Sequence, residues 1–305
     1  MGYIEKEFSN ARVGSSKVPY ILLHILLISV CVVFVYPFLV ILSSSFQTEQ
    51  DIMKHGYSLL PKDVSILAYR MILRDPSILL NSYYVTALTT VIGTLAGLWL
   101  TSSFAYVLSR KDFKYRKYLS FYIFFTMLFH GGLVPSYILV AKWLGMKNTI
   151  WALIIPGIIG GWNILLMKGF LQSIPEAIIE SSKIDGAGEV YTFIRIVLPI
   201  SKPALATVGL FMVLHYWNDW FSTLLYIDSE KLMKLQYMLI RVIRNMEFLN
   251  SAEALQYGLI KPGMEVPTQG AQMAMCVVAA GPMLIVFPFF QKYFVRGMTV
   301  GSIKG

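Results

Sequence analysis

The sequence predicts an all-α integral membrane protein with six transmembrane helices. Of its 305 residues, 56% are hydrophobic and only 14% are charged, and the mean hydropathy is +0.61. Soluble domains usually contain ~45–50% apolar residues. A membrane-spanning helix needs ~20 apolar residues, because its backbone polar groups must be satisfied within the segment. Six nearly charge-free runs meet this requirement: 18–48, 76–109, 118–141, 148–167, 203–227 and 266–291.

Basic residues in the connections predict how these helices are oriented. The first 17 residues carry three basic residues and precede a run too long for a cleaved signal peptide, which predicts an uncleaved signal-anchor with its N-terminus inside. The loop 110–117 holds five basic residues and one acid, a strong cytoplasmic signal. We therefore expect both termini in the cytoplasm. The predicted organisation is a cytoplasmic N-terminal segment (1–17), a six-helix transmembrane domain (18–295) and a cytoplasmic tail (296–305).

Net charge and cysteine content exclude other classes of protein. The formal net charge is +9, but the basic residues flank the apolar runs, which is the membrane-orientation pattern and not a nucleic-acid-binding surface. Cys31 and Cys276 both fall inside apolar runs, where a free thiol is expected and neither a disulfide nor a metal site is predicted.

Polar and helix-breaking residues distinguish the individual spans. The second run is rich in Gly, Ser and Thr, which predicts close packing within a bundle. In the third, His130-Gly131-Gly132 predicts a break or kink. Asp219 in the fifth run costs ~2.5–3.5 kcal/mol at membrane depth, so it either faces a cavity or partner, or lies at the outer interface beside its tryptophans. The long connection 228–265 is expected outside, with a helix through Leu235, Met238, Leu239, Val242 and Met246.

The charged segment 173–199 between the fourth and fifth runs carries the most local information. Ser173 and Glu176 have the spacing of a capping box, which predicts a helix that begins near Ile174. Asp185-Gly186 predicts a turn at a positive φ. A second amphipathic helix then continues to Pro199. We therefore expect two short helices at an angle, with one apolar side, on the cytoplasmic face.

Catalytic motifs are absent from the sequence. It contains no GxxxxGK[ST] loop for ATP, no HExxH, no GxSxG and no pair of carboxylates at membrane depth. We therefore predict a protein that is not an enzyme. Uphill transport by this bundle would draw its energy either from an ion gradient or from another subunit.

The segment 180–199 resembles the EAA motif of bacterial ABC importer permeases, E-A-A-x-x-D-G-A-x5-F-x2-I-x-L-P. Eight of its ten fixed positions match at the correct spacing, from Glu180 to Pro199, and Ser181 and Ser182 replace the two alanines. The whole chain resembles sugar permeases of the maltose-transporter type. The stretch SSSFQTEQDIMKHGYSLLPK is similar to the branch that includes lipoprotein-associated oligosaccharide and polysaccharide permeases.

The resemblance implies a membrane subunit of a carbohydrate importer in the bacterial plasma (inner) membrane. Its implied partners are a second homologous permease, two copies of a cytoplasmic ATPase and an extracellular solute-binding protein. No cofactor is expected in this chain, because Mg-ATP would be bound by the ATPase. The implied ATPase-coupling residues are Glu176, Glu180, Ser181, Ser182, Asp185, Gly186, Ala187, Tyr191 and Phe193.

A carbohydrate passage requires aromatic faces for sugar rings and amides for hydroxyls. The residues predicted to line such a passage are Asn163, Trp217, Asn218 and the carboxylate Asp219, together with Tyr83 and Tyr84. For each of them, helix packing or interface anchoring is the alternative role. Two alternative functions are also open: a stand-alone, gradient-driven sugar carrier, for which only Asp219 offers an ion site, and a structural membrane scaffold.

Overall fold

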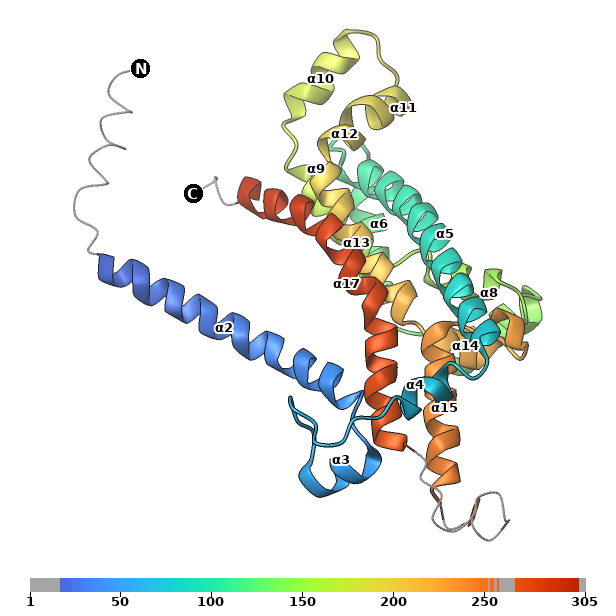
Figure 1. Ribbon diagram of the computed structural model, residues 1–305. Helices are drawn as coiled ribbons and strands as arrows, with labels where there is room; N and C mark the ends of the chain where they lie inside the picture. Colours follow the sequence, from blue (N-terminus) through green and yellow to red (C-terminus); the bar gives the residue numbers. More distant parts are fainter. Residues whose placement is uncertain (1–16, 252, 255–256, 258–266, 302–305) are drawn as a thin grey trace. The chain divides into compact units, whose positions relative to one another are not determined.

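The computed structural model describes residues 17–251, 253–254, 257 and 267–301 as an α-helical chain (Figure 1). Within these residues, extended pairing is limited to an isolated bridge between Gln47 and Val64. The chain divides into two compact units, Met1–Met71 with Leu249–Val277, and Ile72–Phe248 with Val278–Gly305. The mainly helical architecture predicted from the sequence is confirmed.

The first unit contains helices α2 (Lys17–Ser44) and α3 (Glu49–His55), most of α4 (Leu67–Ile72) and the beginning of α17 (Thr268–Gly301). The Thr48 hydroxyl caps α3 by accepting from the amide of Asp51 at 3.2 Å. The carboxylate of Glu49 accepts from the amides of Gln269 and Gly270, which satisfies free N–H groups at the start of α17. The α3 segment is therefore a folded element tied to α17.

The second unit is built around α5 (Pro76–Ser109), the longest helix in it. Helices α13 (Lys202–Asn218), α9 (Gly161–Gln172) and α6 (Arg116–Leu128) pack against α5. Most hydroxyl and glycine positions of α5 are buried, among them Thr86, Thr89, Gly93 and Gly97. Small residues allow the backbones to approach closely, so α5 is the packing centre of this unit.

Two of the predicted spans are bent. Helix α6 ends at Leu128, and after a break at Gly132, whose φ is 92°, the chain continues as α7 (Leu133–Ile138) and a π-helical turn (Leu139–Trp143), bent by 110°. The break predicted at His130-Gly131-Gly132 is confirmed. Helix α8 (Trp151–Ile154) and a 3-10 turn (Ile155–Gly157) meet α9 at 51°.

Among the described residues, three helices are long and apolar enough to cross a membrane, and up to six spans result if each bent pair of helices is one span. The three are Ile21–Ser44, Pro76–Ser109 and Thr268–Pro288. The third bent pair joins Glu189–Ile200 to α13 at 81°. The predicted fifth run, 203–227, is instead interrupted after Asn218, because Asp219 has extended backbone and α14 (Phe221–Tyr226) begins beyond Trp220.

The connection that follows α14 contains a short 3-10 turn (Glu230–Leu232) and α15 (Leu235–Leu249). The predicted amphipathic helix is confirmed, with Leu235, Met238, Leu239 and Met246 buried. Residues 1–16, 258–266 and 302–305, which include most of the predicted N-terminal segment and part of the predicted tail, lie outside the described residues.

Gly93 provides a direct test of the α5–α13 packing. A Cβ atom at this position would overlap the ring of Tyr216, which is 1% exposed and donates from its hydroxyl to the Ile154 carbonyl at 2.8 Å. The Gly93→Ala variant is therefore expected to lose about 1–3 kcal/mol of stability, because a fixed ring cannot move away. Thermal unfolding in detergent measures this loss. The matched control is Gly169→Ala in α9, because a Cβ there meets nothing within 4 Å. If Gly93→Ala is as stable as wild type, the close packing of α5 against Tyr216 is contradicted.

Candidate functional site

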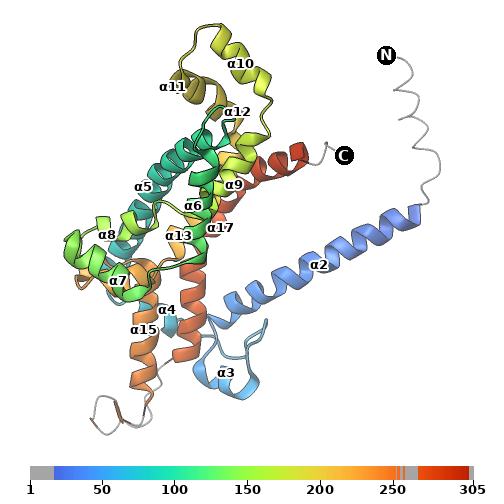
Figure 2. The same cartoon turned by 180° about the vertical axis from the view of Figure 1, so that it is seen from behind.

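The segment 173–199 folds into α10 (Glu176–Ile184), α11 (Glu189–Thr192), a π-helical turn (Phe193–Val197) and α12 (Leu198–Ile200). The helices α10 and α11 lie beyond the C-terminal end of α5 (Figures 1 and 2). Gly186 has a φ of 79°, and the amides of Gly186 and Ala187 donate to the carbonyls of Lys183 and Ser182 at 3.0 Å. This pattern is a Schellman motif, so the predicted turn at Asp185-Gly186 is confirmed.

The predicted capping box is wrong. Pro175 is the N-cap residue and α10 begins at Glu176, two residues later than predicted. The Ser173 hydroxyl instead donates to the Phe170 carbonyl at 2.7 Å, and the Glu176 carboxylate accepts from Lys111 at 2.5 Å. The Glu176 carboxylate bonds to the charged Lys111 and not to the backbone amide of Ser173, because a charged ammonium is a stronger hydrogen-bond donor than a neutral amide.

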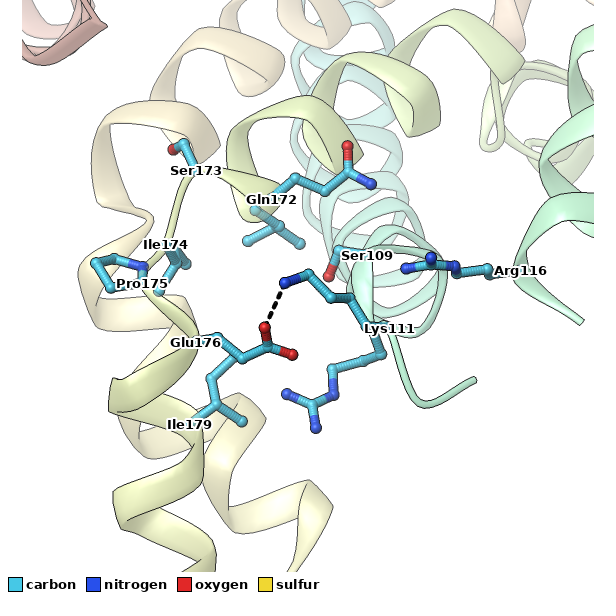
Figure 3. A pocket seen from close by; sticks show the side chains of 11 residues that line it. Ser109, Lys111, Arg116, Gln172, Ser173, Ile174, Pro175, Glu176 and Ile179 are labelled. Atoms are coloured by element: carbon cyan, nitrogen blue, oxygen red, sulfur yellow. Dashed lines mark hydrogen bonds and ion pairs between the residues drawn. The ribbon is translucent and has the colours of Figure 1, made fainter. Parts of the chain in front are cut away.

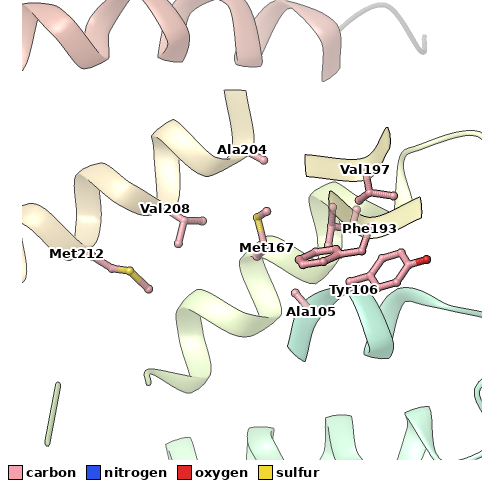
Figure 4. Packing of buried hydrophobic residues seen from close by; sticks show 9 residues of the cluster. Ala105, Tyr106, Met167, Phe193, Val197, Ala204, Val208 and Met212 are labelled. Atoms are coloured by element: carbon pink, nitrogen blue, oxygen red, sulfur yellow. The ribbon is translucent and has the colours of Figure 1, made fainter. Parts of the chain in front are cut away.

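Ser182 and Phe193 connect the segment internally and to the helical bundle. The Ser182 hydroxyl lies 2.8 Å from that of Thr192, and both residues are buried between α10 and α11. Phe193 is buried against Tyr106, with ring centroids 5.1 Å apart. Figure 4 shows Phe193 and Val197 in one cluster with Tyr106 of α5 and with side chains of α9 and α13. The second helix of the segment is thus part of the core of its unit.

A set of ion pairs, which we call the ionic clamp, joins the segment to the loop after α5. Lys111 pairs with Glu176 at 2.5 Å, and Lys183 pairs with Asp112 at 3.1 Å and with Glu189 at 2.6 Å. Hydrogen bonds from Arg110 and Lys183 lower the pKa of Asp112 from 3.8 to about 2, so this carboxylate is ionised at neutral pH. Exposed pairs each contribute about 0–1 kcal/mol, but the two pairs that share Lys183 also define an orientation.

Large apolar side chains remain exposed on the two helices. Ile184 is 85% exposed, Val190 is 72% exposed and Tyr191 is 58% exposed; these three residues are called the apolar tip. Glu180, Ser181 and Asp185 are also exposed, and within the described part of the chain the carboxylate of Glu180 has no ion-pair partner. A cluster of this kind on a charged element indicates a surface for another protein.

The residues predicted for a passage have different surroundings. The Tyr83 hydroxyl donates to the Val278 carbonyl at 2.6 Å, and Trp217 Nε1 donates to the Ala279 carbonyl at 3.1 Å, so both side chains are bonded to adjacent residues of α17. Asn218 is exposed and accepts from Gln236 Nε2 at 3.4 Å. Tyr84 is 65% exposed, and Asn163 is half-buried on α9.

Asp219 has a partner that sequence reasoning missed. Lys234 is fully buried, and its ammonium donates to Asp219 Oδ2 at 3.1 Å and to the Tyr216 carbonyl at 2.6 Å. Asp219 Oδ1 accepts from the amide of Ser222 at 3.1 Å. The free carbonyl at the end of α13 thereby obtains a donor. The signal in the sequence was Lys234 itself, a single lysine directly before the apolar positions of α15, which could have been paired with Asp219.

These features define a helical membrane component, and residues 93–300 match the family described as binding-protein-dependent transport system inner membrane component. The chain belongs to this family. It is therefore an inner-membrane transport component, and the ABC permease is favoured over the stand-alone carrier and the scaffold.

Named relatives align with most of this chain. The polygalacturonan/rhamnogalacturonan transport system permease protein YtcP of Bacillus subtilis is 37% identical over 93% of this chain and 97% of its own length. Protein LplC of the same organism is 39% identical over 89% of this chain and 90% of its own. A chain from the crystal structure of a bacterial ABC transporter involved in the import of the acidic polysaccharide alginate superimposes with a TM-score of 0.74, at 29% identity, over 92% of this chain and 98% of that one.

Proposed function

We propose that this chain is one of two homologous permease subunits of an ATP-driven carbohydrate importer. Its partners are the second permease, two copies of an ATPase that binds Mg-ATP and an extracellular solute-binding protein. The chain crosses the membrane six times with both termini in the cytoplasm, and its domain spans 18–295. The observation that carries the proposal is the apolar tip on a helix pair that the ionic clamp joins to the rest of the bundle.

The coupling step follows from these connections. The ATPase binds the apolar tip, and a basic residue of the ATPase pairs with the exposed Glu180. Because the Ser182–Thr192 contact and the ionic clamp join α10 to α11 and to the loop after α5, the two helices move as one body. Helix α12 is followed after Ser201 by α13, so this movement reaches Trp217, Asn218 and Asp219. Closure of the ATPase is thereby converted into a change of access.

The carbohydrate substrate is supported by the relatives and by the amide and aromatic side chains that the sequence predicts for a passage. The names of the relatives specify galacturonans, arabinooligosaccharides and galactooligosaccharides. Asn163, Asn218 and Tyr84 supply amides and an aromatic face. Tyr83 of α5 and Trp217 of α13 both donate hydrogen bonds to α17. We infer an oligosaccharide substrate, delivered by the binding protein as in the oligosaccharide and polysaccharide branch of these permeases.

Gly186 and Glu180 provide the test. Valine at Gly186 would be forced to a φ of 79°, which costs about 1–2 kcal/mol and changes the angle between α10 and α11. In proteoliposomes that contain the complete importer, we expect Gly186→Val and Glu180→Gln to reduce both binding-protein-stimulated ATP hydrolysis and uptake of labelled oligosaccharide.

Gly188→Ala is the matched control, because Gly188 has a φ of −72° and a Cβ there meets nothing within 4 Å. Unchanged coupling in Gly186→Val and Glu180→Gln would contradict the role of the segment. Uptake by the chain without an ATPase would instead support the carrier.

A further inference from the structure

A cavity of about 300 Å³ lies between the end of α5, the loop after it, the end of α9 and the start of α10. Arg110, Lys111 and Arg116 line it together with Gln172. Leu171 and Ile179 contribute apolar walls. Figure 3 shows the Lys111–Glu176 pair on one side of the cavity and Arg116 on the other, with its guanidinium directed toward Ser109. This space is called the basic cavity.

The cations that line the basic cavity are not all neutralised. Arg110 pairs with Asp112 at 2.8 Å, and Lys111 pairs with Glu176 at 2.5 Å. Arg116 is half-buried, and across the residues that the structure places its guanidinium has neither an ion-pair nor a hydrogen-bond partner. A half-buried guanidinium that no carboxylate neutralises would stabilise an anion bound at this position.

A second cation, Lys168, adds to the positive electrostatic potential around Arg116. The ammonium of Lys168 donates to the Ser120 hydroxyl at 2.8 Å, and that hydroxyl donates to the Arg116 carbonyl at 2.6 Å. Lys168 is half-buried and pairs with no carboxylate in the described ranges. Arg116 of α6, which lines the cavity, and Lys168 of α9, which is linked to Arg116 through Ser120, are therefore two cations without a carboxylate partner in the part of the chain that the structure describes.

The position of the basic cavity identifies the class of anion. Helix α5 ends at Ser109, α6 begins at Arg116 and α9 ends at Gln172, so the cavity lies where membrane helices end. Lipid headgroups occupy that level, and basic pockets between helices on the cytoplasmic side bind anionic headgroups. Arginine suits phosphate because its planar group donates two parallel hydrogen bonds. The apolar Leu171 at the end of α9 would contact the glycerol region of the lipid, which free phosphate lacks.

We propose that the basic cavity binds the phosphate of an anionic phospholipid from the cytoplasmic leaflet, with Arg116 as its main ligand. This inference rests on the proposed function, because the orientation of the segment 173–199 places the cavity on that side. The bound phosphate also lies near Lys111, the clamp residue that holds Glu176 at the first turn of α10. The lipid would thereby adjust how firmly α10 is held, and the stimulated ATP hydrolysis would depend on the anionic lipid content.

Lipid retention by the full-length chain tests the binding directly. Native mass spectrometry would compare wild type, Arg116→Gln, Arg116→Lys and the control Lys117→Gln, an exposed neighbour that does not line the cavity. The probes are phosphatidylglycerol, phosphatidylcholine and inorganic phosphate. We expect wild type and Lys117→Gln to retain phosphatidylglycerol preferentially, Arg116→Gln to bind it about fivefold to tenfold more weakly, and Arg116→Lys to fall between them.

Two other outcomes would overturn the proposal, one of them the site and the other the lipid as its ligand. Equal retention of phosphatidylglycerol by wild type and Arg116→Gln would overturn the site. Inorganic phosphate that displaces the lipid at millimolar concentration would show that the anion comes from solution. Because retention is measured without an ATPase or a sugar, its failure is distinct from failure of the proposed function, which the uptake assay detects in every lipid composition.

Discussion

The Ile184→Asp variant is expected to lose nearly all binding-protein-stimulated ATP hydrolysis in the complete importer. Ile184 is 85% exposed in this chain, so the substitution removes no internal contact. At an interface, loss of a buried isoleucine costs about 1.5–3 kcal/mol, and an unpaired buried carboxylate adds more. A total above about 3 kcal/mol corresponds to more than a 100-fold weaker association with the ATPase.

Association with the ATPase and stability of the chain are measured separately. Co-purification with the ATPase and stimulated hydrolysis should both fall for Ile184→Asp, while the thermal unfolding of the isolated chain stays unchanged. Ile184→Leu is the matched control, because it preserves apolar surface of similar volume. An Ile184→Asp importer with normal hydrolysis would show that the apolar tip is not the contact surface.

Local signals in the sequence predicted the turn of the segment 173–199 because this turn depends on the segment's own residues. A positive φ at Gly186 and helix termination at Asp185 require only short-range backbone hydrogen bonds. The capping box failed because Lys111, which is 65 residues away in the sequence, supplies a stronger donor to Glu176. Local sequence preferences do not predict which charged residue from a distant part of the chain will pair with Glu176.

Of the two helix breaks, the one caused by local residues was predicted from the sequence and the one that involves a distant residue was not. The break after α6 was predictable because Gly131-Gly132 weakens the helix locally. The break after Asn218 was not assigned, although Asp219 stood out, because its cause includes Lys234 from the next connection. The sequence identified the costly carboxylate, and the structure identified the lysine that compensates it.

Lys234→Met is expected to destabilise the folded chain strongly. The Lys234 side chain is fully buried and joins α13 to the start of α15. Its removal leaves the Tyr216 carbonyl without this donor and Asp219 without its counter-ion, and breaking a buried pair by removing one partner costs about 3–5 kcal/mol. Asp219 remains 13% exposed, so we expect a value near the lower limit, about 3 kcal/mol.

Comparison with Asp219 variants separates charge pairing from packing. Burial lowers the pKa of Lys234 and Asp219 opposes this shift, so in Asp219→Asn the amine can lose its proton and still contact the Tyr216 carbonyl. Asp219→Asn should therefore cost less than Lys234→Met, and the double variant should cost less than the sum of the two single variants.

Chemical unfolding in detergent measures these values, with Lys231→Met as the matched control. Lys231 is exposed three positions earlier, so its substitution should change stability by no more than about 0.5 kcal/mol. Strictly additive costs for the single and double variants would mean that Lys234 and Asp219 act independently. The pair would then not be what holds α15 to the end of α13.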